Sequence, residues 1–490
     1  MKQLNGGVCL VLMLPAFAVS AAPADLTVPK VDPAESILSE YVAEAAPDPN
    51  PPPYTLLRYN ERYDYLADPR NRTDFFDPLK YIPLNSGDQQ SYLSLGGELR
   101  ERYENYHNDG LGNGPEPASQ SYLLQRVTFD ADLRLNQRLR VFAQGLSGLQ
   151  FGQRTSAPPV DQNPIDLQQG FADYIFGNPV PEGPRLTARV GRFEMSYGSG
   201  RLVATRAAPN LPFKFDGVQF IAAEGASKLF AFLVRPGQEY EYHLDGENDA
   251  QTFWGAYATT ALGGPLNSNV DAYYLGYRNA SARYATGSGT ELRQTVGTRW
   301  FGQAGGWSYD WEPVLQFGNF ANREIFAWTM ATDTGYTFRA TPWQPRLGFK
   351  ADIASGDSDA PAGRFGGFNP LYFKSGYFND ASIIRPSNVA DLHPSLQLVP
   401  VKSLSATLAT DFLWRYSVKD GVYAPAGNIE LKPLPGSRYI GNTAETAVEW
   451  KAGRHLVCTA SYVHLFASDY VRAAGGGNVD YFGTWATFTW

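Results

Sequence analysis

The feature that most constrains this chain is a series of about eighteen segments, each of roughly ten residues, in which apolar and polar side chains alternate. Alternation with a period of two is the pattern of a β-strand, because successive side chains point to opposite faces. The segments lie near 91–106, 119–135, 138–150, 165–177, 185–197, 216–223, 227–235, 251–260, 270–279, 291–301, 306–317, 325–338, 345–354, 388–399, 403–417, 438–451, 455–466 and 479–490.

The connections between these segments alternate in length. Those after the first, third and fifth segments are long and polar, as are most later odd ones, and the longest are 355–387 and 418–437. The even connections are short, as at 136–137 and 452–454. Transmembrane barrels have short periplasmic turns and long extracellular loops, whereas a soluble propeller or sandwich has no reason to alternate. The sequence therefore predicts an all-β fold, a transmembrane antiparallel β-barrel of about 18 strands with both termini periplasmic.

The two ends of the chain agree with this fold. Lys2, the apolar run 8–14 and small residues up to Ala21 predict a secretory signal peptide at 1–21. Residues 22–88, rich in proline near 47–53, are interpreted as a periplasmic extension, with a disordered leader as the alternative. Residues 89–490 form the predicted barrel, which we expect in the outer membrane of a Gram-negative bacterium.

The last ten residues form a strand with aromatic side chains at both ends of one face. Phe482, Phe488 and Trp490 share that face with Ala486 and Thr484. Aromatic residues that flank small ones suit a strand facing lipid, although an edge strand of a soluble sheet could look the same. We expect this strand to close the barrel against 91–106, because an open edge cannot be left in lipid.

Charged residues fall on one face of the segments. In the first, Glu98, Arg100, Arg102 and Glu104 share a face opposite Leu99. An Arg or Lys that faces lipid at mid-depth costs ~2–4 kcal/mol, so these rows must face the lumen. The basic candidates for the lumen are Arg100, Arg102, Arg126, Arg134, Arg189, Arg192, Arg201, Arg299, Arg346, Lys350 and Arg415, and the acidic ones include Glu98, Asp130, Asp310 and Glu312.

These lumen charges have two interpretations. They could form ion pairs that neutralise one another and keep the inner wall of the barrel hydrated. Alternatively, the basic residues could form a ladder for an anionic solute, since rings of charged side chains set the selectivity of pores. Arg192 and Arg201 also flank a glycine-rich stretch that either folds inward as a constriction or only permits a bulge or loop. Asp357 and Asp359 could hold Ca²⁺ on a loop, although a solvated loop is the simpler reading and no cofactor is expected.

Three short stretches resemble the alginate export family of outer-membrane barrels. They read RVGRFE at 189–194, YGSGRLV at 197–203 and FDG at 215–217, and further matches lie at 354–357, 368–371, 412–415, 438–441 and 462–466. The resemblance spans roughly 90–490. It implies a monomeric barrel of eighteen strands that passes alginate, a polyuronate, outward through an Arg-lined lumen gated by loops. The chain departs from the family at 212–214, where a basic stretch is common, and at Thr443, where an acid is common.

The predicted function is therefore an outer-membrane channel for an anionic polysaccharide such as an alginate-like polyuronate, or for a related anionic solute. The alternative is a general or nutrient-specific diffusion porin for small anions. A hydrolase is less favoured, because the five histidines lie in different segments with no nucleophile motif. We expect contacts with outer-membrane lipid and with periplasmic export scaffold proteins. The net charge of −8 argues against nucleic acid.

Overall fold

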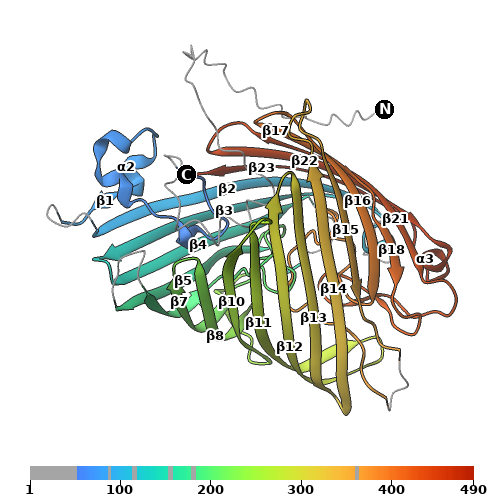
Figure 1. Ribbon diagram of the computed structural model, residues 1–490. Coiled ribbons are helices and arrows are strands. Elements are labelled where there is room, and N and C mark those ends of the chain that lie inside the picture. The colour runs from blue at the N-terminus through green and yellow to red at the C-terminus, as the bar shows by residue number, and fades with distance from the viewer. Residues whose placement is uncertain (1–51, 86–89, 113–118, 153–157, 178–183, 359–362) are drawn as a thin grey trace, which may run out of the picture.

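The computed structural model describes residues 52–85, 90–112, 119–152, 158–177, 184–358 and 363–490, so the signal peptide and the start of the extension lie outside the described residues. The described residues form a closed antiparallel barrel of eighteen strands (Figure 1). Its strands are β2 (Tyr92–His107), β3 (Ser119–Leu135), β4 (Leu139–Phe151), β5 (Asn163–Gly177), β6 (Arg185–Phe193), β7 (Phe215–Glu224), β8 (Ser227–Gln238), β10 (Gln251–Gly263), β11 (Ser268–Tyr284), β12 (Gly287–Ala304), β13 (Trp307–Phe320), β14 (Arg323–Thr337), β15 (Arg346–Ala354), β16 (Val389–Val401), β17 (Leu404–Ala409) continued by β18 (Phe412–Arg415), β21 (Tyr439–Lys451), β22 (Leu456–Ala467) and β23 (Val479–Thr489).

Every predicted strand is present, within a few residues of its expected bounds. The remaining elements are short and lie in the connections: η1 (Arg58–Asn60), η2 (Asp64–Ala67), η3 (Pro69–Asn71), α2 (Asp77–Lys80), β1 (Ile82–Pro83), η4 (Gly110–Gly112), β9 (Gly246–Glu247), β19 (Val422–Tyr423), β20 (Ile429–Leu431) and α3 (Asp469–Ala473). Within the described ranges, the helices are all too short or too polar to cross a bilayer.

The last strand closes the barrel as expected. β23 pairs with β2 from Glu98 opposite Thr489 to His107 opposite Asp480. Gly97 and Trp490 then exchange two backbone hydrogen bonds of 3.0 Å. Closure leaves neither of these strands with an open edge, which a bilayer could not hydrogen-bond.

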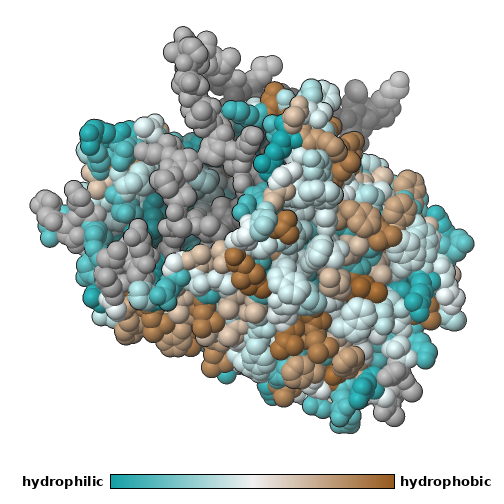
Figure 2. All heavy atoms as spheres, in the orientation of Figure 1, coloured by the Kyte–Doolittle hydropathy of each residue, from teal (hydrophilic) through white to brown (hydrophobic). Residues whose placement is uncertain are grey.

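Inward and outward faces follow the sequence pattern. Phe129, Val190 and Leu233 are each more than half exposed on the outer surface, while the neighbouring Asp130 and Arg189 are buried. Apolar side chains are spread over the outer surface of the strands (Figure 2). The outer surface is thus suited to lipid, and charged side chains such as Asp130 and Arg189 are buried inside the barrel.

The fifteenth strand is interrupted, where the sequence predicted one strand over 403–417. β17 and β18 both pair with β16 and β21, and Thr410 and Asp411 separate them. The neighbouring residue on β16 is Pro394, whose carbonyl accepts a hydrogen bond from the Thr410 N–H. Proline has no N–H to donate in return, so the ladder opens at this point.

The core of the molecule lies inside the barrel rather than between layers. Two long loops, 194–214 and 355–388, contribute the buried residues Val203, Phe365 and Tyr372. These belong to one cluster with inward residues of the strands such as Phe253 and Tyr284. The loops therefore occupy part of the lumen, and aromatic packing fixes them there.

Residues 52–85 pack against the barrel at the end where the chain terminates, and α2 lies beside the C-terminus (Figure 1). Arg58 donates a hydrogen bond of 3.0 Å to the Trp490 carbonyl. The Tyr59 ring makes edge contacts with Phe142 and Phe171, and its hydroxyl donates to the Glu194 carbonyl at 2.9 Å. This segment thus contacts the inward loop 194–214 from the end of the barrel at which the chain terminates.

Candidate solute pathway

The two inward loops pair with each other through backbone hydrogen bonds. Val203 and Tyr372 form a parallel bridge. The Tyr372 N–H donates to Leu202 at 2.9 Å and the Lys374 N–H donates to Gly200 at 2.8 Å. Gly200 has φ +72°, a left-handed backbone that favours glycine. The glycine-rich stretch therefore pairs with loop 355–388 inside the barrel.

Most of the basic residues predicted for the lumen are bound to carboxylates. Several of these contacts are two-pronged, such as Arg189 to Asp173 and Arg192 to Asp216. The shortest N–O distances are Arg102–Glu104 2.6 Å, Arg126–Glu98 2.8 Å, Arg134–Asp132 3.0 Å, Arg189–Asp173 2.8 Å, Arg192–Asp216 2.8 Å, Arg201–Asp310 2.7 Å, Arg299–Asp310 2.6 Å, Arg346–Asp333 3.3 Å and Lys350–Asp352 3.6 Å. For these residues the geometry favours the ion-pair interpretation over a ladder of free cations.

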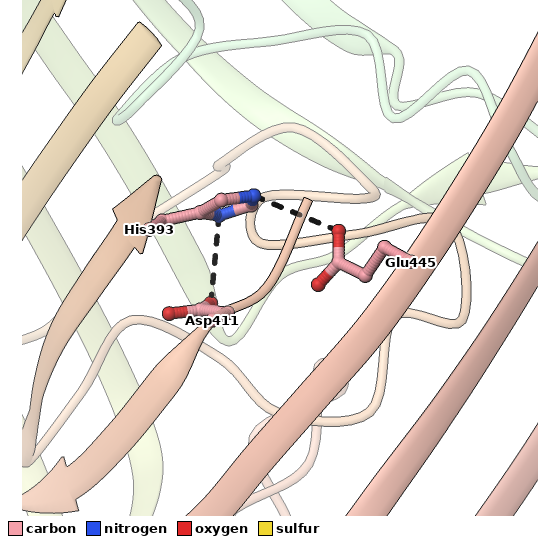
Figure 3. Close-up of side chains that lie close together, drawn as sticks. All are labelled: His393, Asp411 and Glu445. Carbon is pink, nitrogen blue, oxygen red and sulfur yellow. Dashed lines mark ion pairs between the residues drawn. The ribbon is translucent and has the colours of Figure 1, made fainter. Parts of the chain in front are cut away.

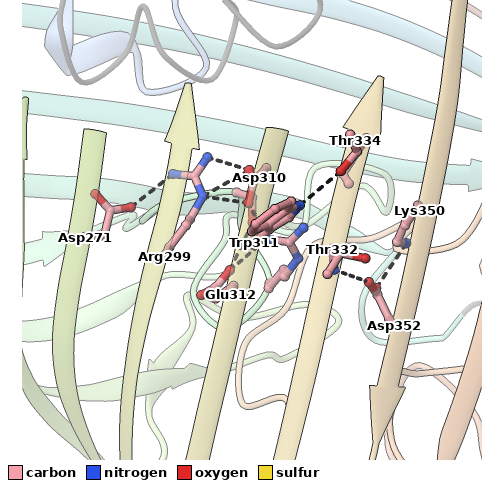
Figure 4. Close-up of polar contacts among 12 residues, drawn as sticks. Asp271, Arg299, Asp310, Trp311, Glu312, Thr332, Thr334, Lys350 and Asp352 are labelled. Carbon is pink, nitrogen blue, oxygen red and sulfur yellow. Dashed lines mark hydrogen bonds and ion pairs between the residues drawn. The ribbon is translucent and has the colours of Figure 1, made fainter. Parts of the chain in front are cut away.

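The densest network spans β11, β12 and β13. Arg299 lies between Asp271 and Asp310 (Figure 4). Arg201, from the inward loop, contacts both Asp310 and Glu312, and Tyr273 donates to Glu312 at 2.7 Å. The network ties loop 194–214 to the wall, so the predicted acidic residues here act as anchors for the loop.

Arg100 and Arg415 contact carbonyl groups, and within the described residues no carboxylate lies in ion-pair range of either. Arg100 donates to the carbonyls of Ala207 and Pro209 at 2.6 and 3.0 Å. Arg415 donates to the Ser437 carbonyl at 2.5 Å, and its guanidinium lies 3.5 Å from the centre of the Tyr470 ring. Both residues hold loops against the barrel wall.

The other predicted acidic residues also have partners. Asp130 lies 3.7 Å from Arg58 of the N-terminal segment. Asp357, the residue suggested for Ca²⁺, accepts two hydrogen bonds from Arg323 at 2.6 and 2.9 Å. Its suggested companion, Asp359, lies outside the described residues. Arg323 supplies the positive charge that a calcium ion would bring to Asp357.

Sequence reasoning missed Lys374, which lies where the two loops meet. In the part of the chain that the structure describes, its amino group has no hydrogen bond and no ion pair, and the residue is partly buried. Burial, together with the positive charges of Lys350 and Arg201, lowers the pKa of Lys374 to about 8. A lysine in a long polar loop carries no sequence signal for a lumen position.

Comparisons with known proteins agree with this architecture. The family model described as alginate export matches residues 91–484. Among solved structures, the barrel is similar to Pseudomonas aeruginosa OccK5 (OpdH), with 12% identity, 81% of this chain and 97% of that chain covered and a TM-score of 0.54. A BenF-like porin from Pseudomonas fluorescens Pf-5 has 10% identity, coverage of 81% and 99% and a TM-score of 0.55.

A third similar structure is P. aeruginosa OccK2 (OpdF) in complex with glucuronate, with 11% identity, coverage of 81% and 97% and a TM-score of 0.53. At these identities the likeness is one of fold, and the fold is that of outer-membrane porins. A search of curated proteins found no significant match.

Proposed function

Because this chain belongs to the alginate export family of outer-membrane channels, we propose that it passes an alginate-like polyuronate outward through the lumen. Family and fold both point to a channel in the Gram-negative outer membrane. The identity of the solute is our proposal. It is supported by the charge pattern of the lumen rather than by any likeness in sequence to the solved porins.

The observation that carries the proposal is Lys374. The basic residues predicted for the lumen lie in ion-pair range of carboxylates or donate to loop carbonyls, so they offer little to a passing anion. Lys374 has a pKa of about 8 and is therefore mostly charged at pH 7. A partly buried cation with no ion pair among the described residues attracts a carboxylate without trapping it, and conduction requires binding that is weak enough to leave.

A polymer also requires the inward loops to move. Loop 355–388 is fixed by aromatic packing and by the bridge between Val203 and Tyr372, so a sugar chain in transit must displace it. We propose that this loop gates the channel. A small anion would need less displacement, and the glucuronate bound in the OccK2 structure is a single uronate, so a porin for small anions stays the second candidate.

Block of single-channel current separates these candidates. An oligouronate added to the purified protein in a planar bilayer is expected to reduce conductance at lower carboxylate concentration than glucuronate does. A neutral oligosaccharide of equal length serves as the matched control and should block weakly. If oligouronates fail to block at millimolar concentration while small organic anions compete, the polymer proposal is wrong.

Three further assignments complete the proposal. Residues 22–88 form a periplasmic extension, supported by the packing of 52–85 beside the C-terminus. The channel is a monomer, and it meets periplasmic export scaffold proteins at this end. Chemical cross-linking of the full chain in the membrane, read by mass spectrometry, would detect scaffold proteins on this segment or a second copy of the barrel.

A further inference from the structure

A second cluster of titratable residues lies in the barrel wall, apart from the contact of the two loops. His393 on β16, Asp411 between β17 and β18, and Glu445 on β21 point toward one another (Figure 3). One potential ligand atom from each lies within 4.8 Å of the others. His393 Nδ1 is 3.6 Å from Asp411 Oδ2, and Nε2 is 3.6 Å from Glu445 Oε2. We propose that this cluster binds a divalent transition-metal ion such as Zn²⁺.

The break in the fifteenth strand places Asp411 in this cluster. Pro394 opens the ladder at that point, and the Asp411 N–H bonds to the Thr443 hydroxyl at 3.0 Å. The Asp411 side chain is 0% exposed, yet neither of its carboxylate oxygens has a hydrogen-bond partner in the described residues. A fully buried carboxylate without a donor is costly unless a proton or a cation compensates it.

The surroundings carry an excess of negative charge. Asp391, two residues before His393 on the same face of β16, is also buried, and among the described residues its two oxygens have no hydrogen-bond partner. Asp352 lies directly opposite it on β15. Lys350, the cation nearest to this group, is 3.6 Å from Asp352 and donates to the Tyr377 carbonyl. Four carboxylates thus share one lysine, and a divalent cation would offset two of the three remaining negative charges.

The donor set indicates which ion. An imidazole nitrogen with two carboxylates suits Zn²⁺, whereas Ca²⁺ and Mg²⁺ prefer oxygen ligands alone. Tetrahedral Zn²⁺ with bonds of about 2.0–2.2 Å needs ligand atoms about 3.4 Å apart, so a pair at the 4.8 Å limit must close by about 1.4 Å. His393 and Glu445 each keep over a tenth of the side chain exposed, and an ion can reach them from the lumen.

Zn²⁺ titration of the metal-stripped full chain in detergent tests the proposal. We expect one Zn²⁺ per chain, at least tenfold weaker binding in Asp411→Asn and His393→Gln, and weaker binding of Ca²⁺ than of Zn²⁺. His464→Gln is the matched control, because His464 pairs with a single carboxylate, Asp480, at 2.7 Å. This variant should bind Zn²⁺ as the parent does.

Thermal unfolding supplies the second measurement. Saturating Zn²⁺ should raise the Tm of the parent but not that of Asp411→Asn, because a ligand stabilises only the state that binds it. Without metal, Asp411→Asn should melt at least as high as the parent, since it removes a buried charge that has no donor. Stoichiometry near zero at pH 7, or equal affinity in the parent and Asp411→Asn, would overturn the proposal, and so would Ca²⁺ binding as tight as Zn²⁺.

Discussion

The selectivity of this channel should depend on Lys374. The substitution Lys374→Gln removes its charge and keeps a polar side chain of similar length. Because the pKa of Lys374 is about 8, about nine tenths of the channels carry the charge at pH 7 and about one tenth at pH 9, since one pH unit is a tenfold change. At about 4 Å one such charge attracts an anion by at least ~1 kcal/mol, the value in bulk water, which is roughly a fivefold enrichment.

Reversal potentials in a KCl gradient measure this effect. The parent should lose anion selectivity as pH rises from 7 to 9, since a lysine is charged below its pKa and neutral above it. Lys374→Gln should be about fivefold less anion-selective at pH 7 and flat with pH. Lys374→Arg should stay selective to pH 9.5, because arginine keeps its proton.

The matched control is Lys419→Gln, which removes an exposed lysine from the loop that follows β18. It should behave as the parent does. If Lys374→Gln has the parent's reversal potential at pH 7, or if Lys374→Arg loses selectivity with pH as the parent does, Lys374 does not set selectivity. The proposal of polyuronate transport then loses the observation on which it rests.

Three other perturbations have definite expected outcomes. Burial raises the pKa of Glu194 from 4.5 to about 7, so ionisation of this carboxyl group destabilises the folded state from pH 4.5 upward. Glu194→Gln should therefore increase the free energy of unfolding at pH 8 by up to about 3 kcal/mol and raise the Tm. At pH 4 the Tm should be unchanged. Cysteines at Val203 and Tyr372, a bridged pair, should form a disulfide that stops block by oligouronate while small-ion current persists; block that continues after oxidation would contradict gating by these loops. Deletion of Trp490 removes two hydrogen bonds to Gly97, each worth ~0.5–1.5 kcal/mol, and should lower the temperature at which the barrel unfolds in a gel-shift assay, whereas an unchanged temperature would argue against its part in closure.

The barrel was predictable because the bilayer imposes a period of two on every strand. That constraint is local, so it can be read from the sequence around residues such as Phe129 and Asp130. The partners of the inward residues are not local. Arg100 is buried, and its contacts are carbonyls near Pro209, more than a hundred residues away. Lumen charge alone therefore could not distinguish a residue that holds a loop from one that meets a solute.

The inward loops show why the free cation was missed. Loop 355–388 is polar in the sequence like any extracellular loop, and its position depends on long-range pairing such as Val203 with Tyr372. Once the loop is inside, its charges join the lumen, and Lys374 has no ion pair among the described residues, unlike most of the predicted strand arginines. It follows that strand residues set the shape of the pathway, while Lys374 of the inward loop brings a positive charge that the predicted strand arginines, bound to carboxylates or carbonyls, do not offer.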